Sequence, residues 1–92
     1  MKHHIIIKFN KDVDKERIID EIKKYFDNAY KVEGIKKVEV FTSSVRLRNR
    51  FDMMIKITIS KDNLKDFENS DFYLGFKDKY SKYISKKTIF DY

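Results

Sequence analysis

The stretch 49–59, NRFDMMIKITI, decides the fold of this chain. Its apolar and polar side chains alternate, with Phe51, Met53, Ile55, Ile57 and Ile59 in one phase and Asp52, Lys56 and Thr58 in the other. Period-two alternation is typical of a β-strand with one buried face. We therefore interpret Asn49–Ile59 as a central strand. Its Phe51 phase is expected to hold helices, and its Asp52 phase to face away from them.

Three further segments are predicted to pair with this strand. His3–Phe9 alternates His3, Ile5 and Ile7 with Ile6 and Lys8, Ile35–Thr42 is a more polar strand, and Lys86–Tyr92 closes the chain. A polar strand is typical of a sheet edge. The segment 43–48 between the second and third strands is too long for a two-residue hairpin turn.

Two helical regions separate these strands. Asp12 or Asp14 is expected to cap a helix that runs to about Lys31, because apolar residues recur there at three-and-four spacing. Gly34 follows, where a left-handed residue would let the chain turn into a strand. After Ile59 a short helical turn carries Leu64 and Phe67. Residues 69–71 interrupt the pattern, and a second helix restarts with an aromatic stripe: Phe72, Phe76, Tyr80 and Tyr83.

The order strand, helix, strand, strand, helix, strand predicts an α+β fold, the ferredoxin-like βαββαβ sandwich. In it a four-stranded antiparallel sheet carries both helices on one face, and residues 1–92 form a single domain. The opposite face would expose apolar side chains, and a homodimer packed sheet on sheet would cover them as a dimeric α+β barrel. We expect its interface at Ile6, Phe41, Asp52 and Met54, with some of Thr88, Phe90 and Tyr92.

Composition narrows the classes of function. The 92 residues contain no cysteine, which excludes disulfides and thiolate chemistry. The first apolar run ends at Lys8, too short for a signal peptide or a membrane span, so we expect a cytoplasmic protein without a membrane partner. The net charge of +6 is spread among interleaved Lys, Asp and Glu, as on a solvated surface, which argues against nucleic acid as a partner.

Several segments together resemble the stress-responsive A/B barrel (Dabb) family, whose members are dimeric α+β barrels of this strand order. The resemblance spans nearly the whole chain. The segments that carry it are Lys2-His3 before an apolar strand ending Lys8-Phe9, Gly34 before the second strand, NRFD at 49–52, Gly75-Phe76 in the second helix, and IFDY at 89–92.

The resemblance implies a ligand pocket between sheet and helices. A plant polyketide cyclase of the family has there a histidine on its first strand, a tyrosine, and a second histidine. Carried over by position, the first-strand histidine is His3, the catalytic tyrosine falls on Phe67, and Tyr73 replaces the second histidine. A phenol with a pKa near 10 is a poorer base than an imidazole near 6.5, so His3 is the candidate catalytic residue. The expected lining is His3, Ile5, Ile7, Phe67, Tyr73, Phe76 and Tyr80.

The same residues also have purely structural interpretations. An aromatic stripe at helical spacing is also typical of an ordinary core, and His3 could be a hydrogen-bonded residue near a frayed terminus. His4 should face away from His3, so the two histidines would not share a metal ion, and we expect neither a metal nor a cofactor. Arg46, Arg48 and Arg50 could bind phosphate or carboxylate, form a solvated loop, or pair with acids across a dimer.

The leading hypothesis is a small homodimeric Dabb-like protein that binds a small apolar or aromatic molecule beside His3, with or without catalysis. A second hypothesis is a cofactor-free enzyme, such as a polyketide cyclase or a monooxygenase-like protein. A third is an RNA-binding module, because RNA-recognition domains have the same strand order. The Gly-Phe-rich motif of those domains is missing from 49–59, which disfavours RNA.

Overall fold

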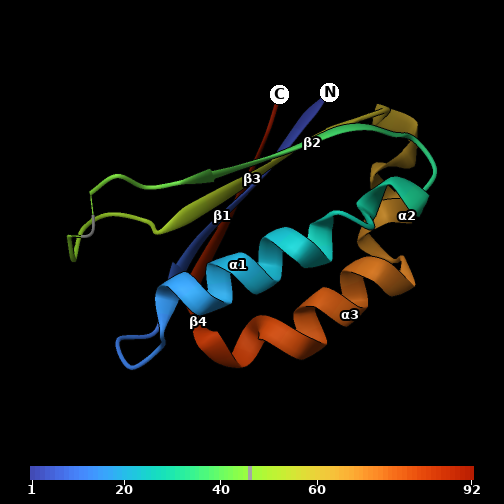
Figure 1. Cartoon of the computed structure of the whole chain (residues 1–92). Coiled ribbons are helices and arrows are strands. Elements are labelled where there is room, and N and C mark those ends of the chain that lie inside the picture. Colours follow the sequence, from blue (N-terminus) through green and yellow to red (C-terminus); the bar gives the residue numbers. More distant parts are fainter. Residues whose placement is uncertain (46) are drawn as a thin grey trace.

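A computed structural model describes residues 1–45 and 47–92, and its helices all lie on one side of a single sheet (Figure 1). None of the helices in these ranges is long and apolar enough to span a membrane. In chain order the elements are β1 (Lys2–Phe9), α1 (Lys15–Phe26), η1 (Ala29–Lys31), β2 (Ile35–Thr42), β3 (Met53–Ile59), η2 (Lys61–Asn63), α2 (Leu64–Glu68), α3 (Asp71–Tyr80), η3 (Ser81–Tyr83) and β4 (Ile84–Asp91), where η marks a one-turn 3-10 helix.

The sheet has the order β2-β3-β1-β4, and every neighbouring pair is antiparallel. β1 and β3 are therefore the central strands, and β2 is an edge, as predicted. The two ends of the chain lie side by side (Figure 1), because Lys2 N–H donates to Tyr92 O at 2.7 Å and Tyr92 N–H to Lys2 O at 3.0 Å. The predicted α+β ferredoxin-like fold is confirmed.

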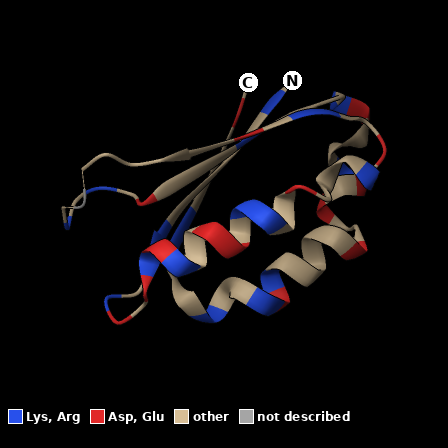
Figure 2. Cartoon of the chain, viewed as in Figure 1, with Lys and Arg blue, Asp and Glu red and all other residues tan. Residues whose placement is uncertain are grey.

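The core lies between the helices and the inner face of the sheet. Alternate residues of β1 and β3 point into it, and the stripe of α1 packs against them, as period two and period 3.6 require. Charged positions alternate with uncharged ones along the α1 ribbon (Figure 2), and most of the charged residues of this helix are exposed. Residues at most 1 % exposed within this core include Ile5, Ile7, Ile18, Ile22, Phe26, Ala29, Ile55, Ile57, Ile59, Phe67, Phe76 and Tyr80.

Local hydrogen bonds set the limits of the helices. Asp14 caps α1 by accepting from Arg17 N–H at 3.3 Å, and Ser70 caps α3 by accepting from Tyr73 N–H at 3.1 Å. α1 ends at Phe26 and not near Lys31 as predicted, because Asn28 leaves helical geometry and the next residues form η1. Gly34 has a φ of +90°, which confirms the predicted left-handed position before β2.

β3 begins at Met53, later than the predicted Asn49, and the alternation breaks at that point. Asp52 was expected on the outer face, but it is 1 % exposed on the inner side. Its Oδ2 accepts from Phe9 N–H at 2.8 Å, its Oδ1 lies 3.4 Å from Lys15 Nζ, and its own N–H donates to Ile7 O at 2.8 Å. These partners turn the carboxylate inward.

Phe51 changes face with Asp52. It was predicted in the core phase, yet it is only partly buried and lines a hollow with outer-face residues such as Ile6 and Phe41. Lys86 Nζ lies 5.9 Å from the centre of its ring. β4 also begins two residues before the predicted Lys86, because Ile84 still pairs with Phe9 after a register shift in which Ser85 of β4 is the extra residue.

We predict that Asp52→Ala lowers the free energy of unfolding by about 1–3 kcal/mol, because Phe9 N–H and Lys15 lose their buried acceptor. Urea denaturation followed by circular dichroism measures this. Asp52→Asn keeps an oxygen at this position and should lose less. Asp20→Ala on the exposed side of α1 serves as the control and should stay within about 0.5 kcal/mol of the parent. Equal stability of Asp52→Ala and the parent would contradict the assigned role.

Candidate functional site

His3 lies on the inner face of β1 and is 1 % exposed. The register of β1 with β4 places it opposite Asp91, and its Nδ1 is hydrogen-bonded to Asp91 Oδ1. The interpretation of His3 as a residue at a frayed terminus is therefore wrong. Backbone pairing of both chain ends holds the imidazole and the carboxylate together.

The other nitrogen of the His3 ring, Nε2, points into the core. Within residues 1–45 and 47–92 it is buried and has no hydrogen-bond partner. The ring meets Phe67 edge-on, with 5.8 Å between the ring centres. A carboxylate that accepts from Nδ1–H holds the ring in the tautomer whose Nε2 carries a lone pair. With the imidazole neutral, this arrangement presents a buried hydrogen-bond acceptor at Nε2.

Among the residues predicted to line the pocket, Phe67 contacts the His3 ring, and Tyr73, Phe76 and Tyr80 continue from Phe67 in a series of ring contacts. Phe67 and Tyr73 have ring centres 4.9 Å apart, Tyr73 and Phe76 5.8 Å, and Phe76 and Tyr80 5.7 Å. Ile5 and Ile7 continue the inner face of β1 beside His3 and are fully buried. In this structure the side chains fill the space between sheet and helices with one another, and their role as a ligand lining stays a prediction.

Tyr73 forms a second polar pair at the margin of this cluster. Lys87 Nζ donates to its hydroxyl at 3.2 Å and lies 5.3 Å from the ring centre, while Lys77 Nζ lies 5.4 Å from the same ring. Burial raises the pKa of the Tyr73 phenol and lowers the pKa of the Lys87 ammonium. At neutral pH the phenol stays protonated, which suits a hydrogen-bond donor better than a base.

The edge strand β4 leaves this region open on one side. Lys87, Ile89 and Asp91 share the inner phase, because they pair with Ile7, Ile5 and His3. Ile89 is nevertheless 40 % exposed, so the helices do not cover the end of β4. The sequence did not reveal Asp91 or Lys87 as site residues, because Asp91 meets His3 through the register of β1 with β4 and Lys87 meets Tyr73 through the packing of α3 on the sheet.

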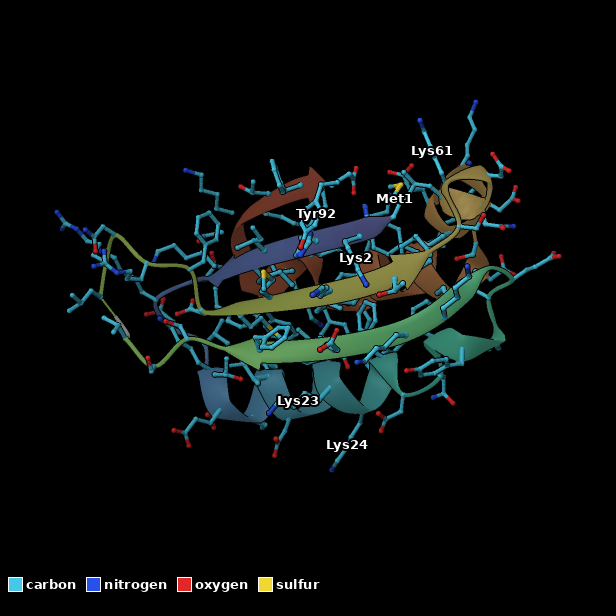
Figure 3. The ribbon with its side chains drawn as sticks, turned by 90° about the horizontal axis from the view of Figure 1, so that it is seen from above. Met1, Lys2, Lys23, Lys24, Lys61 and Tyr92 are labelled. Atoms are coloured by element: carbon cyan, nitrogen blue, oxygen red, sulfur yellow. The ribbon has the colours of Figure 1, made fainter. Side chains whose placement is uncertain are left out.

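The outer face of the sheet carries the other predicted site. Ile6, Phe41 and Met54 lie on it as expected, and they border one hollow. His4 also faces outward, where its ring stacks on Tyr92 at 5.1 Å between centres and its Nδ1 lies 3.1 Å from Phe90 O. Figure 3 looks down on this face, with Tyr92 over β1 and the helices beneath the sheet. Their role in an interface stays a prediction, and Asp52 no longer belongs to this face.

Of the three arginines before β3, Arg48 and Arg50 have different surroundings. Arg46 lies outside the described residues. Arg50 Nη1 donates to Asn49 Oδ1 at 2.8 Å, whereas Arg48 lines a cleft at the end of β1. Among residues 1–45 and 47–92, no group of three or more His, Asp or Glu side chains is arranged to hold a metal ion.

We predict that the Tyr73 phenol ionises above pH 10.0, because burial opposes its charge. The free energy of unfolding should then fall as pH rises above 10, because the Tyr73 phenol releases its proton more readily in the unfolded chain than in the folded one. The lowered pKa of Lys87 has the opposite effect, because its ammonium group releases its proton more readily in the folded chain. NMR titration of ¹³Cζ-tyrosine, with the resonance assigned by its loss in Tyr73→Phe, measures the midpoint. A midpoint at or below 10.0 would contradict the burial of this hydroxyl.

Comparison with known proteins identifies solved structures with the same fold. No protein-family model and no curated protein sequence matches the chain. Among solved structures, a dimeric ferredoxin-like protein of unknown function from Bacteroides fragilis is similar, with a TM-score of 0.83 and 17 % identity over 99 % of this chain and 92 % of that one.

Two further structures connect the fold with a family and with an enzyme. A Dabb family protein from Mesorhizobium loti has a TM-score of 0.74 and 9 % identity, covering 99 % of this chain and 92 % of that one. A hydroxynitrile lyase from Passiflora edulis has a TM-score of 0.80 and 16 % identity, covering 99 % of this chain and 89 % of that one. This chain therefore has the ferredoxin-like fold that a Dabb protein also adopts.

Proposed function

We propose that this chain is a single-domain member of the Dabb family that works as a homodimer and binds a small, largely apolar or aromatic molecule beside His3. The observation that carries the proposal is the unpartnered, buried Nε2 of His3, whose ring is oriented by Asp91. A buried polar atom without a partner costs free energy, so such atoms in native proteins call for an explanation. A ligand hydroxyl that donates a hydrogen bond to Nε2 would explain why this atom has no partner within the protein.

The surroundings of Nε2 select the ligand chemistry. Phe67 presents its ring to the imidazole, and the rings of Tyr73 and Phe76 follow it. A flat molecule that displaces or parts these rings would exchange one aromatic contact for another, while the Tyr73 hydroxyl offers a polar group at the margin. The exposed Ile89 marks the side of β4 from which such a molecule could reach the site.

The dimer is proposed from the outer face. Phe90 and Tyr92 are 59 % and 66 % exposed at the β4 edge of this face, and Phe41 is 44 % exposed on the opposite edge strand, β2. Large exposed aromatic side chains on an uncovered sheet face are typical of a protein interface. A two-fold axis would use the same face on both copies, and the similar ferredoxin-like protein from Bacteroides fragilis is dimeric.

Catalysis is the second candidate function, and the hydrogen-bonded pair of His3 and Asp91 favours it. An imidazole whose Nδ1 is held by a carboxylate is the usual arrangement for a general base, which here would act through Nε2. The hydroxynitrile lyase among the similar structures shows that the fold can serve an enzyme. In this form of the proposal the bound hydroxyl would transfer its proton to His3.

We predict that phenols, uncharged at neutral pH, bind and raise the melting temperature, because they bind the folded chain alone. His3→Phe keeps an aromatic ring but removes the acceptor and should weaken binding about three- to tenfold. His4→Phe is the matched control, since the neighbouring ring faces outward, and should leave the affinity within about twofold. Differential scanning fluorimetry and isothermal titration calorimetry measure both.

Two results would count against the proposed site. The first is that no phenol or neutral aromatic alcohol stabilises the parent chain. The second is that His3→Phe and His4→Phe bind a ligand equally well, since only His3 points toward the core.

A further inference from the structure

A cleft of about 500 Å³ lies at the end of the sheet where β1 and the β2–β3 connection meet the starts of α1 and β4. It is separate from His3, which sits at the other end of β1. With a rise of about 3.3 Å per residue, the two ends of this strand are about 20 Å apart. The cleft is lined by Lys8, Phe9, Asn10, Lys11, Lys15, Leu47, Arg48 and Ser85.

The charged side chains of this cleft all carry the same sign. Lys8, Lys11, Lys15 and Arg48 line it, and its described lining includes no aspartate or glutamate. Lys15 is offset by Asp52, which lies behind it at 3.4 Å, and Lys8 Nζ donates to the neutral Arg50 carbonyl at 2.7 Å. Lys11 and Arg48 have no carboxylate within ion-pair distance among the described residues. Figure 2 shows basic positions on the elements that meet here.

Apolar surface accompanies these cations. Leu47 is 57 % exposed at the rim, and Phe9 closes the inner end of the cleft while remaining buried in the core. Leu47 therefore presents apolar surface beside the cations of the cleft. A volume of this size suits one small molecule, and ligand sites of this kind combine apolar walls with a few charged groups.

We propose that this cleft binds a small amphipathic anion, a carboxylate joined to a short apolar body. Arg48 and Lys11 would hold the carboxylate, because guanidinium and ammonium groups make their strongest hydrogen bonds to anions. Leu47 would cover the apolar part. Inorganic phosphate would satisfy only the cations. A nucleic acid strand that continued from this cleft past Asn10 and Lys11 would meet the carboxylates of Asp12 and Asp14 in the adjoining hollow, which disfavours it.

Octanoate is the probe for the test, followed by ¹H–¹⁵N NMR of the amides of Lys11, Lys15 and Arg48. We expect saturable shifts with octanoate, with at least about tenfold weaker binding for acetate, for phosphate and for uncharged octanol, since each lacks one half of the chemistry. Phosphate that binds as tightly as octanoate would overturn the amphipathic assignment. Tighter binding of a single-stranded oligouridine at the same residues would overturn it in favour of nucleic acid.

Charge reversal locates the site. Lys11→Glu combined with Arg48→Glu should weaken octanoate binding at least about tenfold. The matched control is Lys23→Glu combined with Lys24→Glu on α1, exposed positions labelled in Figure 3. It makes the same change in net charge and should leave affinity within about twofold. Equal loss in both double variants would show general charge attraction and overturn the site.

Two further measurements distinguish a loss of binding from a loss of folding. Dispersed amide spectra of both double variants establish that they fold, and Lys11→Gln with Arg48→Gln removes the charges without reversing them. The neutral pair should weaken octanoate less than the reversed pair does but more than the control does. Leu47→Ser should weaken octanoate and leave acetate unchanged, and an unchanged octanoate affinity would remove the apolar wall from the proposal.

Discussion

A four-stranded sheet has two faces, and in this protein α1, α2 and α3 all cover the same one (Figure 1). Strand alternation then gives neighbouring residues opposite surroundings. His3 enters the core and meets Phe67, whereas His4, one residue later, lies under Tyr92 on the outer face. The inner face holds the polar pairs proposed to meet a small molecule, and the outer face holds the aromatic patch proposed to meet a second copy.

β1 connects these features, because polar contacts lie at both of its ends. Near its start, His3 is joined to Asp91 of β4. At its end, Phe9 N–H is held by Asp52 at the beginning of β3, and Lys15 of α1 is held by the same carboxylate. One end places an imidazole beside the aromatic core, and the other shapes the basic cleft. The strand therefore carries two candidate sites that are separated by its own length.

The sequence was sufficient to predict the fold, because period two and period 3.6 depend on local order alone. It also predicted that His3 turns inward and that Ile6, Phe41 and Met54 turn outward. It failed at Asp52, where alternation was extended past the first residue of β3 and a buried carboxylate was placed in the dimer interface on the outer face. Periodicity cannot reveal that a backbone N–H at the end of β1 lacks a ladder partner. That information lies in the register between strands.

The candidate site was predicted in part for the same reason. The pocket residues meet as expected because helix and strand faces determine which side chains meet. Asp91 and Lys87 were not found, because the pairing of β1 with β4 brings Asp91 to His3, and the packing of α3 against β4 brings Tyr73 to Lys87. The sequence indicated Arg48 as a possible anion ligand but did not place it in a cleft with Lys8, Lys11 and Lys15. These four cations come from one strand, two loops and a helix.

The proposed homodimer, formed through the uncovered outer face of the sheet, is tested most directly by the mass of the protein in solution. Size-exclusion chromatography with multi-angle light scattering should give about twice the 11.2 kDa of one chain at micromolar concentration. Met54→Lys should shift the mass toward one chain, because a charge placed in the interface on both copies is not compensated. A parent mass equal to one chain across that concentration range would contradict the account.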